Sequence, residues 1–410
     1  MLARVIAVDP MALARRQLAT DRARTKRFPL LFARKLARMS ASPLAFLRGA
    51  APLFYELLDT HPSLAEGPRG KGWLVGDLHI ENFGAYRPNP TDNGTRSARD
   101  ATFNLNDFDD AIIGPWRFDV LRFTTSLLLA GRELGADGTR ALDLCHGMLD
   151  AYVDAAFHHA KPPRQPEAVQ RLVAQVTART RKQLLDARTV VTHGARRFVR
   201  GDRYIDLPPG LARKVPRAFA RYVETLGDNC PSDDAMQIVD YAQRIAGTGS
   251  LGGVRVAVLV RGKGSADGGW IFDMKEQGMP AAARILGDPE IVPAERVAQA
   301  FRACVAHPAH LIGTTEMGGL SMFVRKLTPQ EDKLNLGRLR DADLDPLATY
   351  LGALLGAAHL RGATKTPKHP WTRSERAETI HRAIAIAGIH EAVYLALCKV
   401  ARDQRAGDDA

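Results

Sequence analysis

The stretch Gly76-Asp77-Leu78-His79-Ile80-Glu81-Asn82-Phe83-Gly84 follows a short apolar run and places an aspartate five residues ahead of an asparagine. This spacing is typical of phosphoryl-transfer loops, in which the aspartate accepts the proton of an attacking hydroxyl and the asparagine oxygen binds Mg²⁺. The alternative is a polar turn in which Asp77 and Asn82 cap backbone N–H groups. The stretch thus predicts Asp77 as a catalytic base and Asn82 as a metal ligand.

A second acidic stretch, Asn106-Asp107-Phe108-Asp109-Asp110-Ala111, follows the predicted strand 102–105. A hard cation needs carboxylate oxygens, and a strand next to the Asp77 loop is where a phosphotransferase keeps its principal Mg²⁺ ligand. The stretch therefore predicts Asp107 as that catalytic metal ligand and Asp109 as a further one. We expect the strands 73–75 and 102–105 to form a hairpin.

Asp119 opens the predicted helix 118–133, whose apolar residues are spaced for one buried face. Asp119 is either a plain N-cap of this helix or a carboxylate that accepts hydrogen bonds from the backbone of the Asp77 loop and holds that loop in place.

The glycine-rich stretch Gly247-Thr248-Gly249-Ser250-Leu251-Gly252-Gly253-Val254 fits the pattern G-x-G-x-x-G-x-V. A dinucleotide fold would place a helix after these glycines, whereas Val254 to Val260 has the composition of a strand. This order favours a flap over the phosphates of ATP. The predicted nucleotide-binding residues in it are Gly247, Thr248, Gly249, Ser250 and Gly252.

Lys275 ends the predicted strand 270–274, beyond a glycine-rich hairpin tip. In a kinase-like fold the lysine of this strand binds the α- and β-phosphates, so Lys275 is predicted to be both catalytic and nucleotide-binding. We expect Glu295, on the next helix, to pair with Lys275 and fix its ammonium group. Glu276 and Glu290 are the alternative partners for Lys275. The alternative without a function is that Lys275 is an exposed lysine at the end of a strand.

The chain has 410 residues, 45% of them hydrophobic and 25% charged, which is ordinary globular composition. Lys and Arg number 57 and Asp and Glu 45, so the formal net charge is +12, which favours anionic partners without choosing among them. The N-terminus lacks an unbroken apolar stretch, and no membrane span of 18 apolar residues is expected. Cys145, Cys230, Cys304 and Cys398 show no paired spacing, so we expect a soluble cytoplasmic protein.

The predicted fold class is α+β, with a two-lobed, protein-kinase-like architecture. We expect a helical lobe over 1–235 that carries the catalytic and metal loops, a small β-rich lobe over 236–330 that covers the nucleotide, and helices over 331–410 that complete the helical lobe. Because the glycine loop follows the catalytic loop, the order of kinase elements would be circularly permuted. Permutation leaves packing intact where chain termini are close.

Several motifs also resemble, in order, the bacterial domain-of-unknown-function 2252 family. They are residues 39–49, 76–84 and 106–111, the Gly247 loop with Lys275-Glu276, and residues 323–327. This resemblance spans roughly residues 30–365 and implies shared architecture rather than a substrate.

The Asp77 and Asp107 stretches are separately similar to the catalytic and metal loops of aminoglycoside phosphotransferases and choline kinases. That similarity implies Asp77 as the base, Asn82 and Asp107 as Mg²⁺ ligands, and Asp119 as the loop anchor. Asp77 and Asp107 are 30 residues apart (107 − 77), a longer gap than those families use, and the order is permuted.

The expected function is an ATP-dependent phosphotransferase that moves the γ-phosphoryl group to a hydroxyl acceptor, with ATP and Mg²⁺ as cofactors. The alternatives are a nucleotide-binding pseudokinase, a basic adaptor that uses the Arg-rich stretch 171–200, or a nucleotidyl transferase with the same site. Nucleic-acid binding rests only on the net charge. For His79 we expect a hydrogen bond within its own loop, whereas Arg48 and Arg325 are either ion-pair partners or phosphate contacts. The sequence leaves the acceptor open.

Overall fold

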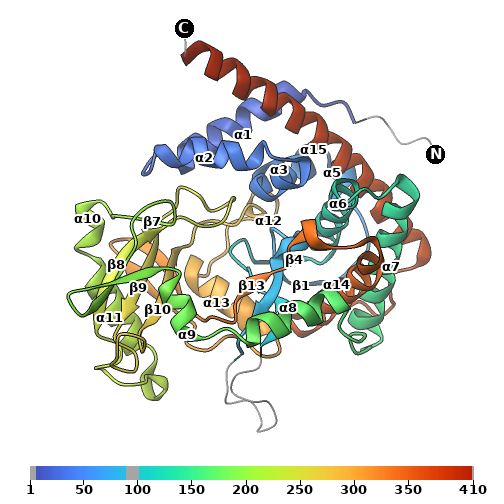
Figure 1. Ribbon diagram of the computed structural model, residues 1–410. Helices are drawn as coiled ribbons and strands as arrows, with labels where there is room; N and C mark the ends of the chain where they lie inside the picture. The colour runs from blue at the N-terminus through green and yellow to red at the C-terminus, as the bar shows by residue number, and fades with distance from the viewer. Residues whose placement is uncertain (1–5, 89–100, 409–410) are drawn as a thin grey trace.

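The computed structural model describes residues 6–88 and 101–408, with side chains described as far as Asp403 (Figure 1). Most of the predicted polar stretch 87–100, from residue 89 on, lies outside the described residues. The described part is a mixed α+β structure with several small antiparallel sheets, which agrees with the predicted class.

The largest sheet has six antiparallel strands in the order β11-β12-β10-β9-β8-β7. The predicted strands around the glycine stretch and at 320–327 are all confirmed in it. Its strands are β7 (Tyr204–Ile205), β8 (Ile238–Arg244), β9 (Arg255–Val260), β10 (Trp270–Glu276), β11 (Gly313–Met317) and β12 (Leu320–Leu327).

Alternation along the strands gives this sheet two different faces. One face carries Val256, Val258 and Met274, which pack with α11 in one apolar core. The other face carries Leu259 and Ile271 in a second core, under α9 and the hairpin β5–β6, which places the sheet between two layers as the left half of Figure 1 shows. The layers consist of α9 (Arg181–Asp186), β5 (Thr189–Thr192), β6 (Ala195–Phe198), α10 (Pro209–Ala212), α11 (Val215–Glu224) and α13 (Pro293–Cys304). Helices α8 (Glu167–Thr177) and α12 (Ala283–Leu286) pack instead with the largest apolar core, in the other half of the molecule. The packing around the sheet thus begins ahead of residue 236.

A helical region forms the other half of the molecule and holds the largest apolar core. Its main helices are α6 (Arg117–Glu133), α7 (Gly138–Phe157), α14 (Asp341–Arg361) and α15 (Arg373–Asp408). The N-terminal segment adds α1 (Pro10–Arg24), α2 (Leu30–Met39), α3 (Pro43–Gly49), α4 (Ala51–Thr60) and α5 (Pro62–Ala65), so both ends of the chain build this region. Among the described residues, one window in α15 is long and apolar enough to cross a membrane by length and composition alone, which was not expected from the sequence. In this structure α15 packs against α1, α3 and α6.

Two three-stranded sheets lie between these halves. One has the order β14-β1-β4 and the other β13-β2-β3. The predicted hairpin of 73–75 with 102–105 is wrong, because the turn η1 (Ile80–Asn82) redirects the chain and the fully buried strand β2 pairs with β3 instead. The strands are β1 (Lys71–Leu74), β2 (Phe83–Tyr86), β3 (Thr102–Leu105), β4 (Ile112–Pro115), β13 (Asp332–Lys333) and β14 (Ala363–Lys365).

Glycines let helices α7 and α14 approach closely. A Cβ added at Gly352 would lie 2.2 Å from the carbonyl oxygen of Met148, and one at Gly356 would lie 2.4 Å from that of Tyr152. Any larger residue must therefore push these two helices apart.

We expect Gly352→Ala to lower the free energy of unfolding by roughly 1–3 kcal/mol, because the overpacking outweighs the gain in helix propensity. Gly388→Ala is the matched control: Gly388 is an exposed helical glycine of α15 with nothing within 4 Å of an added Cβ. That variant should gain up to about 1 kcal/mol. Denaturant unfolding of both variants checks the prediction, and equal shifts in the same direction would contradict it.

Candidate functional site

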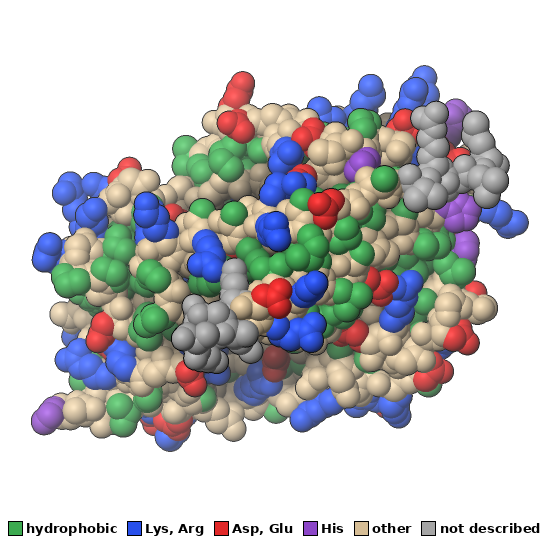
Figure 2. Space-filling model, turned by 90° about the horizontal axis from the view of Figure 1, so that it is seen from above, with side chains coloured by type: hydrophobic (Ala, Val, Ile, Leu, Met, Phe, Trp, Pro, Cys, Tyr) green, Lys and Arg blue, Asp and Glu red, His purple; other side chains and the backbone are tan. Residues whose placement is uncertain are grey.

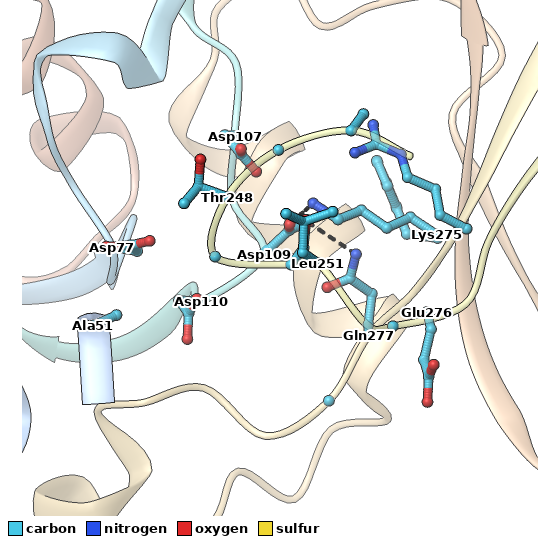
Figure 3. Close-up of a pocket in the computed structure, with 18 of the residues that line it drawn as sticks. Ala51, Asp77, Asp107, Asp109, Asp110, Thr248, Leu251, Lys275, Glu276 and Gln277 are labelled. Carbon is cyan, nitrogen blue, oxygen red and sulfur yellow. Dashed lines mark hydrogen bonds and ion pairs between the residues drawn. The ribbon is translucent and has the colours of Figure 1, made fainter. Parts of the chain in front are cut away.

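A cavity of about 1050 Å³ lies between the six-stranded sheet and the helical region. Four stretches predicted separately from the sequence all line it: the Asp77 loop, the Asp107 stretch, the glycine loop and Lys275 (Figure 3). The sequence-predicted residues on its wall are Asp77, Asn82, Asp107, Asp109, Gly247, Thr248, Gly249, Ser250, Gly252 and Lys275, whereas Glu295 is not among the residues that line it.

Asp77 is positioned by the buried Arg122 of α6. The Nε of Arg122 donates to Asp77 Oδ1 at 3.0 Å, and its Nη2 donates to the same oxygen and to the Leu47 carbonyl at 2.8 Å. Burial raises the pKa of Asp77 to about 7, although Arg122 opposes the shift and the nearby Asp110 adds to it. Asp77 therefore exchanges a proton near neutral pH, which suits a general base.

Asp119 anchors the backbone just ahead of Asp77. Its fully buried carboxylate accepts hydrogen bonds from the N–H of Val75 at 2.6 Å and of Gly76 at 2.9 Å. His359 of α14 contacts the same carboxylate at 3.2 Å and stacks on Trp116. Asp119 thus makes the contacts expected of a loop anchor, and α6 begins without a side-chain cap.

The turn η1 fixes the rest of the Asp77 loop. The N–H of His79 donates to Asn82 Oδ1 at 2.7 Å, and Nδ1 of His79 accepts from the N–H of Glu81 at 3.2 Å. Burial, helped by Arg48, lowers the pKa of His79 well below its usual range, so the ring is neutral. His79 therefore has the structural role expected for it, and Arg48 pairs with Glu81 at 2.6 Å.

Asp107 is half-buried and has no hydrogen-bond or ion-pair partner among the described residues. Burial would raise its pKa, but Lys275, Lys333, Arg255 and Arg325 act against burial and the net shift is downward, so it stays ionised. Such a carboxylate can accept a cation.

The oxygens available to Mg²⁺ around Asp107 are few. The buried Oδ1 of Asn106 also lacks a partner, while Oδ1 of Asn82 has one lone pair left beside its bond to His79. Residues 6–88 and 101–408 contain no cluster of three or more His, Cys, Asp or Glu side chains that would hold a metal by itself. The donor set fits a cation that takes a carboxylate and amide oxygens from the protein and its other ligands from a phosphate and water.

Lys275, at the end of β10, forms an ion pair with Asp109, whose other oxygen accepts from Gln277 at 2.9 Å (Figure 3). Burial lowers the pKa of Lys275, while Asp107 acts in the opposite direction. Glu295 is instead 3.4 Å from the hydroxyl of Thr314, so the predicted pairing of Lys275 with Glu295 is wrong. Asp109, predicted as a further metal ligand, is the carboxylate that pairs with Lys275, and its role as a metal ligand stays a prediction.

Arg296 of α13 ties this loop to the sheet. Its buried guanidinium donates to the carbonyl oxygens of Asp109 at 2.9 Å and Gly278 at 3.0 Å, and also to that of Ala111. Sequence reasoning missed both Arg296 and Arg122, because each acts through distant segments. The one feature of the sequence that could have indicated a role for Arg122 is its position three residues after Asp119, one turn further along the same helix.

The glycine loop is supported from outside by α2. Lys35, fully buried and paired with Asp21 at 2.6 Å, donates to the Gly249 carbonyl at 3.2 Å, and Arg38 donates to that of Gly247. In a trans peptide the N–H points opposite to the C=O. The N–H groups of Thr248 and Ser250 therefore point away from α2, and no group among the described residues accepts from them. Free N–H groups of this kind form an anion-binding loop.

The Asp119 anchor predicts a stability effect that an ordinary cap would not show. Asp119→Ala should lower the free energy of unfolding by roughly 3–5 kcal/mol, because it leaves two buried N–H groups and His359 without their partner. Asp137→Ala removes an exposed carboxylate that only caps α7 and should cost about 1 kcal/mol. Chemical unfolding of the two variants measures the difference, and similar losses would argue against an anchor.

Comparison with known proteins finds a family but no characterised relative. No curated protein and no solved structure matches the chain. The family model described as "Uncharacterized protein conserved in bacteria (DUF2252)" matches residues 27–404, which is nearly the whole chain. The chain therefore belongs to this bacterial family.

Proposed function

We propose that the protein is an ATP-dependent phosphotransferase that moves the γ-phosphoryl group to a hydroxyl acceptor, in a permuted kinase-like arrangement of its two halves. The main support is that one cavity is lined by four stretches distant in sequence, each with a distinct part in such chemistry. Their meeting in one place is unexpected for four unrelated polar turns.

In the proposed mechanism the oxygen of the acceptor hydroxyl attacks the γ-phosphorus while Asp77 accepts the hydroxyl proton. The bond from that phosphorus to the β,γ-bridging oxygen breaks, and ADP leaves. Arg122 holds the Asp77 carboxylate in place through its two contacts. The Asp119 anchor fixes the backbone that carries Asp77. The protein thus contributes mainly position, which is the larger part of catalysis in phosphoryl transfer.

The phosphates would lie between the glycine loop and Lys275. There they would accept hydrogen bonds from the free N–H groups of the loop and pair with the ammonium group of Lys275. Asp107, with the amide oxygens of Asn82 and Asn106, would hold Mg²⁺. When bound, this ion neutralises charge on the phosphate oxygens. On binding, Lys275 exchanges Asp109 for a phosphate.

The basic-adaptor alternative has less support. Most of the arginines in 171–200 have carboxylate partners; Arg171, Arg179, Arg196 and Arg200 pair with Asp343, Asp332, Asp267 and Asp240. The face shown in Figure 2 carries Lys and Arg with Asp and Glu among them rather than a continuous basic stripe. Nucleic-acid binding prefers such a stripe.

The first test is calorimetric titration of MgATP into the wild-type protein. Asp107→Ala and Lys275→Ala should each weaken binding roughly tenfold to a hundredfold, since each removes a charged contact to the bound complex. Asp107 has no partner to lose, so its variant should stay folded.

Lys182→Ala, which removes an exposed lysine paired with Asp186, is the matched control and should bind like the wild type. Absence of MgATP binding in the folded wild-type protein, or equal binding in all variants, would refute the proposal.

The pKa of Asp77 predicts how turnover depends on pH. Because the base must be ionised, ATP hydrolysis should rise with pH and be half-maximal near the pKa of about 7. In Arg122→Gln the cation that lowers this pKa is gone, so the midpoint should move to higher pH. Arg132→Gln, an exposed arginine of the same helix paired with Glu391, should leave the midpoint in place. A pH series on the three proteins decides, and an unmoved midpoint in Arg122→Gln would contradict the assignment.

A further inference from the structure

A cluster of arginines lines the sheet side of the cavity. Arg244 of β8, Arg255 of β9 and Arg325 of β12 surround the carboxylate of Asp273 on β10. Arg255 donates to both Asp273 oxygens, at 2.5–3.1 Å, and Arg244 lies 2.8 Å from it. Asp273 is 2% exposed, so this ion cluster is buried at the end of the cavity rather than on an outer surface.

The guanidinium groups in this cluster outnumber the carboxylates that they contact directly, and the ionised Asp107 lies near Arg255 and Arg325 without contacting them. Three guanidinium groups face the single carboxylate of Asp273 and, at 3.4 Å from Arg325, that of Glu331. The Nε of Arg244 is buried and has no hydrogen-bond partner. A buried N–H group without an acceptor is costly, so a ligand that supplies anionic oxygens would bind favourably here.

The wall beside Lys275 is mixed in character. Phe323 lies directly opposite Lys275 on β12 and lines the cavity, whereas Arg255 lies opposite Lys275 on β9. Two residues away along β10, Arg325 lies directly opposite Asp273, so the wall is charged there. A planar base needs apolar walls, so the arginine cluster lies outside the stretch that suits a base.

We infer that Arg244, Arg255 and Arg325 form a phosphate-binding subsite on the sheet side of the cavity. This inference rests on the proposed function, because the subsite lies in the same cavity as the proposed nucleotide site. The phosphate has two possible sources. It belongs either to the terminal groups of the nucleotide itself or to a phosphate ester on a separate ligand.

The first source changes the group that is moved. With the terminal phosphates in the subsite, the acceptor oxygen bonds to the α-phosphorus, the bond from that phosphorus to the α,β-bridging oxygen breaks, pyrophosphate leaves, and Asp77 takes the hydroxyl proton. With the second source, γ-phosphoryl transfer stands as proposed.

The test is calorimetric titration of tripolyphosphate, which carries no base or sugar. It should bind the wild-type protein, and Arg325→Met and Arg244→Met should each weaken binding about tenfold or more. Arg261→Met removes an exposed arginine just beyond β9, paired with Asp234, and should leave the affinity unchanged. Arg325→Lys, which keeps the charge, should bind more tightly than Arg325→Met and covers the case in which the methionine variant unfolds.

Failure of wild-type binding, or wild-type affinity in both folded Arg244→Met and folded Arg325→Met, would overturn the subsite. That result is separate from the MgATP titration of Asp107→Ala and Lys275→Ala, which tests only the proposed function. Slow ATP hydrolysis then separates the sources: AMP and pyrophosphate indicate the nucleotide's own phosphates, and ADP and phosphate indicate a separate ligand.

Discussion

The carboxylate of Asp119 is the contact on which the arrangement of the site depends. It is fully buried, yet it is satisfied by two backbone N–H groups and by His359, so its burial fixes three segments at once. The segments are the strand end before Asp77, the start of α6 and the end of α14. Because a buried charge is tolerated only with all its partners in place, this geometry is strongly favoured. One turn further along α6, Arg122 contacts Asp77, so one helix positions both the carboxylate of Asp77 and the backbone that precedes it.

The opposite wall of the cavity is built on a different principle. The six-stranded sheet contributes mostly cations, whereas the loops of the helical region contribute most of the carboxylates. Lys275 and Asp109 meet across this division, and Arg296 holds the Asp109 loop by backbone carbonyls alone. The cavity thus combines one side that holds most of the carboxylates with another that holds mostly cations. Such a division of charge can attract an anion and a cation to neighbouring places.

Local patterns were sufficient to predict the pieces but not the way they pair. Strand β9 coincides with a run rich in β-branched residues, and the glycine stretch comes directly before it. Both could therefore be predicted from the sequence. Strand β2 was missed because all four of its residues are buried and no alternation marks it. Glu295 was expected to meet Lys275 on the basis of order alone, but the side chain that meets it is Asp109, which precedes it by 166 residues. Arg296 and Lys35 act through contacts that no spacing rule predicts, and for Arg122 the spacing from Asp119 gave the only indication.

The position of the glycine loop depends on its support by the N-terminal helices. A glycine-rich loop has high backbone conformational entropy when it is unsupported, and it loses this entropy when it binds a ligand. Here Lys35 and Arg38 hold two of its carbonyl oxygens beforehand, and a Cβ at Gly252 would lie 2.7 Å from the Arg24 carbonyl, so the loop is seated on the N-terminal helices. Helix α2 packs against α1 and α3, and α1 and α3 in turn pack against α15, the last helix of the chain. The two ends of the chain therefore join behind the loop, and its position depends on their packing rather than on its place in the sequence.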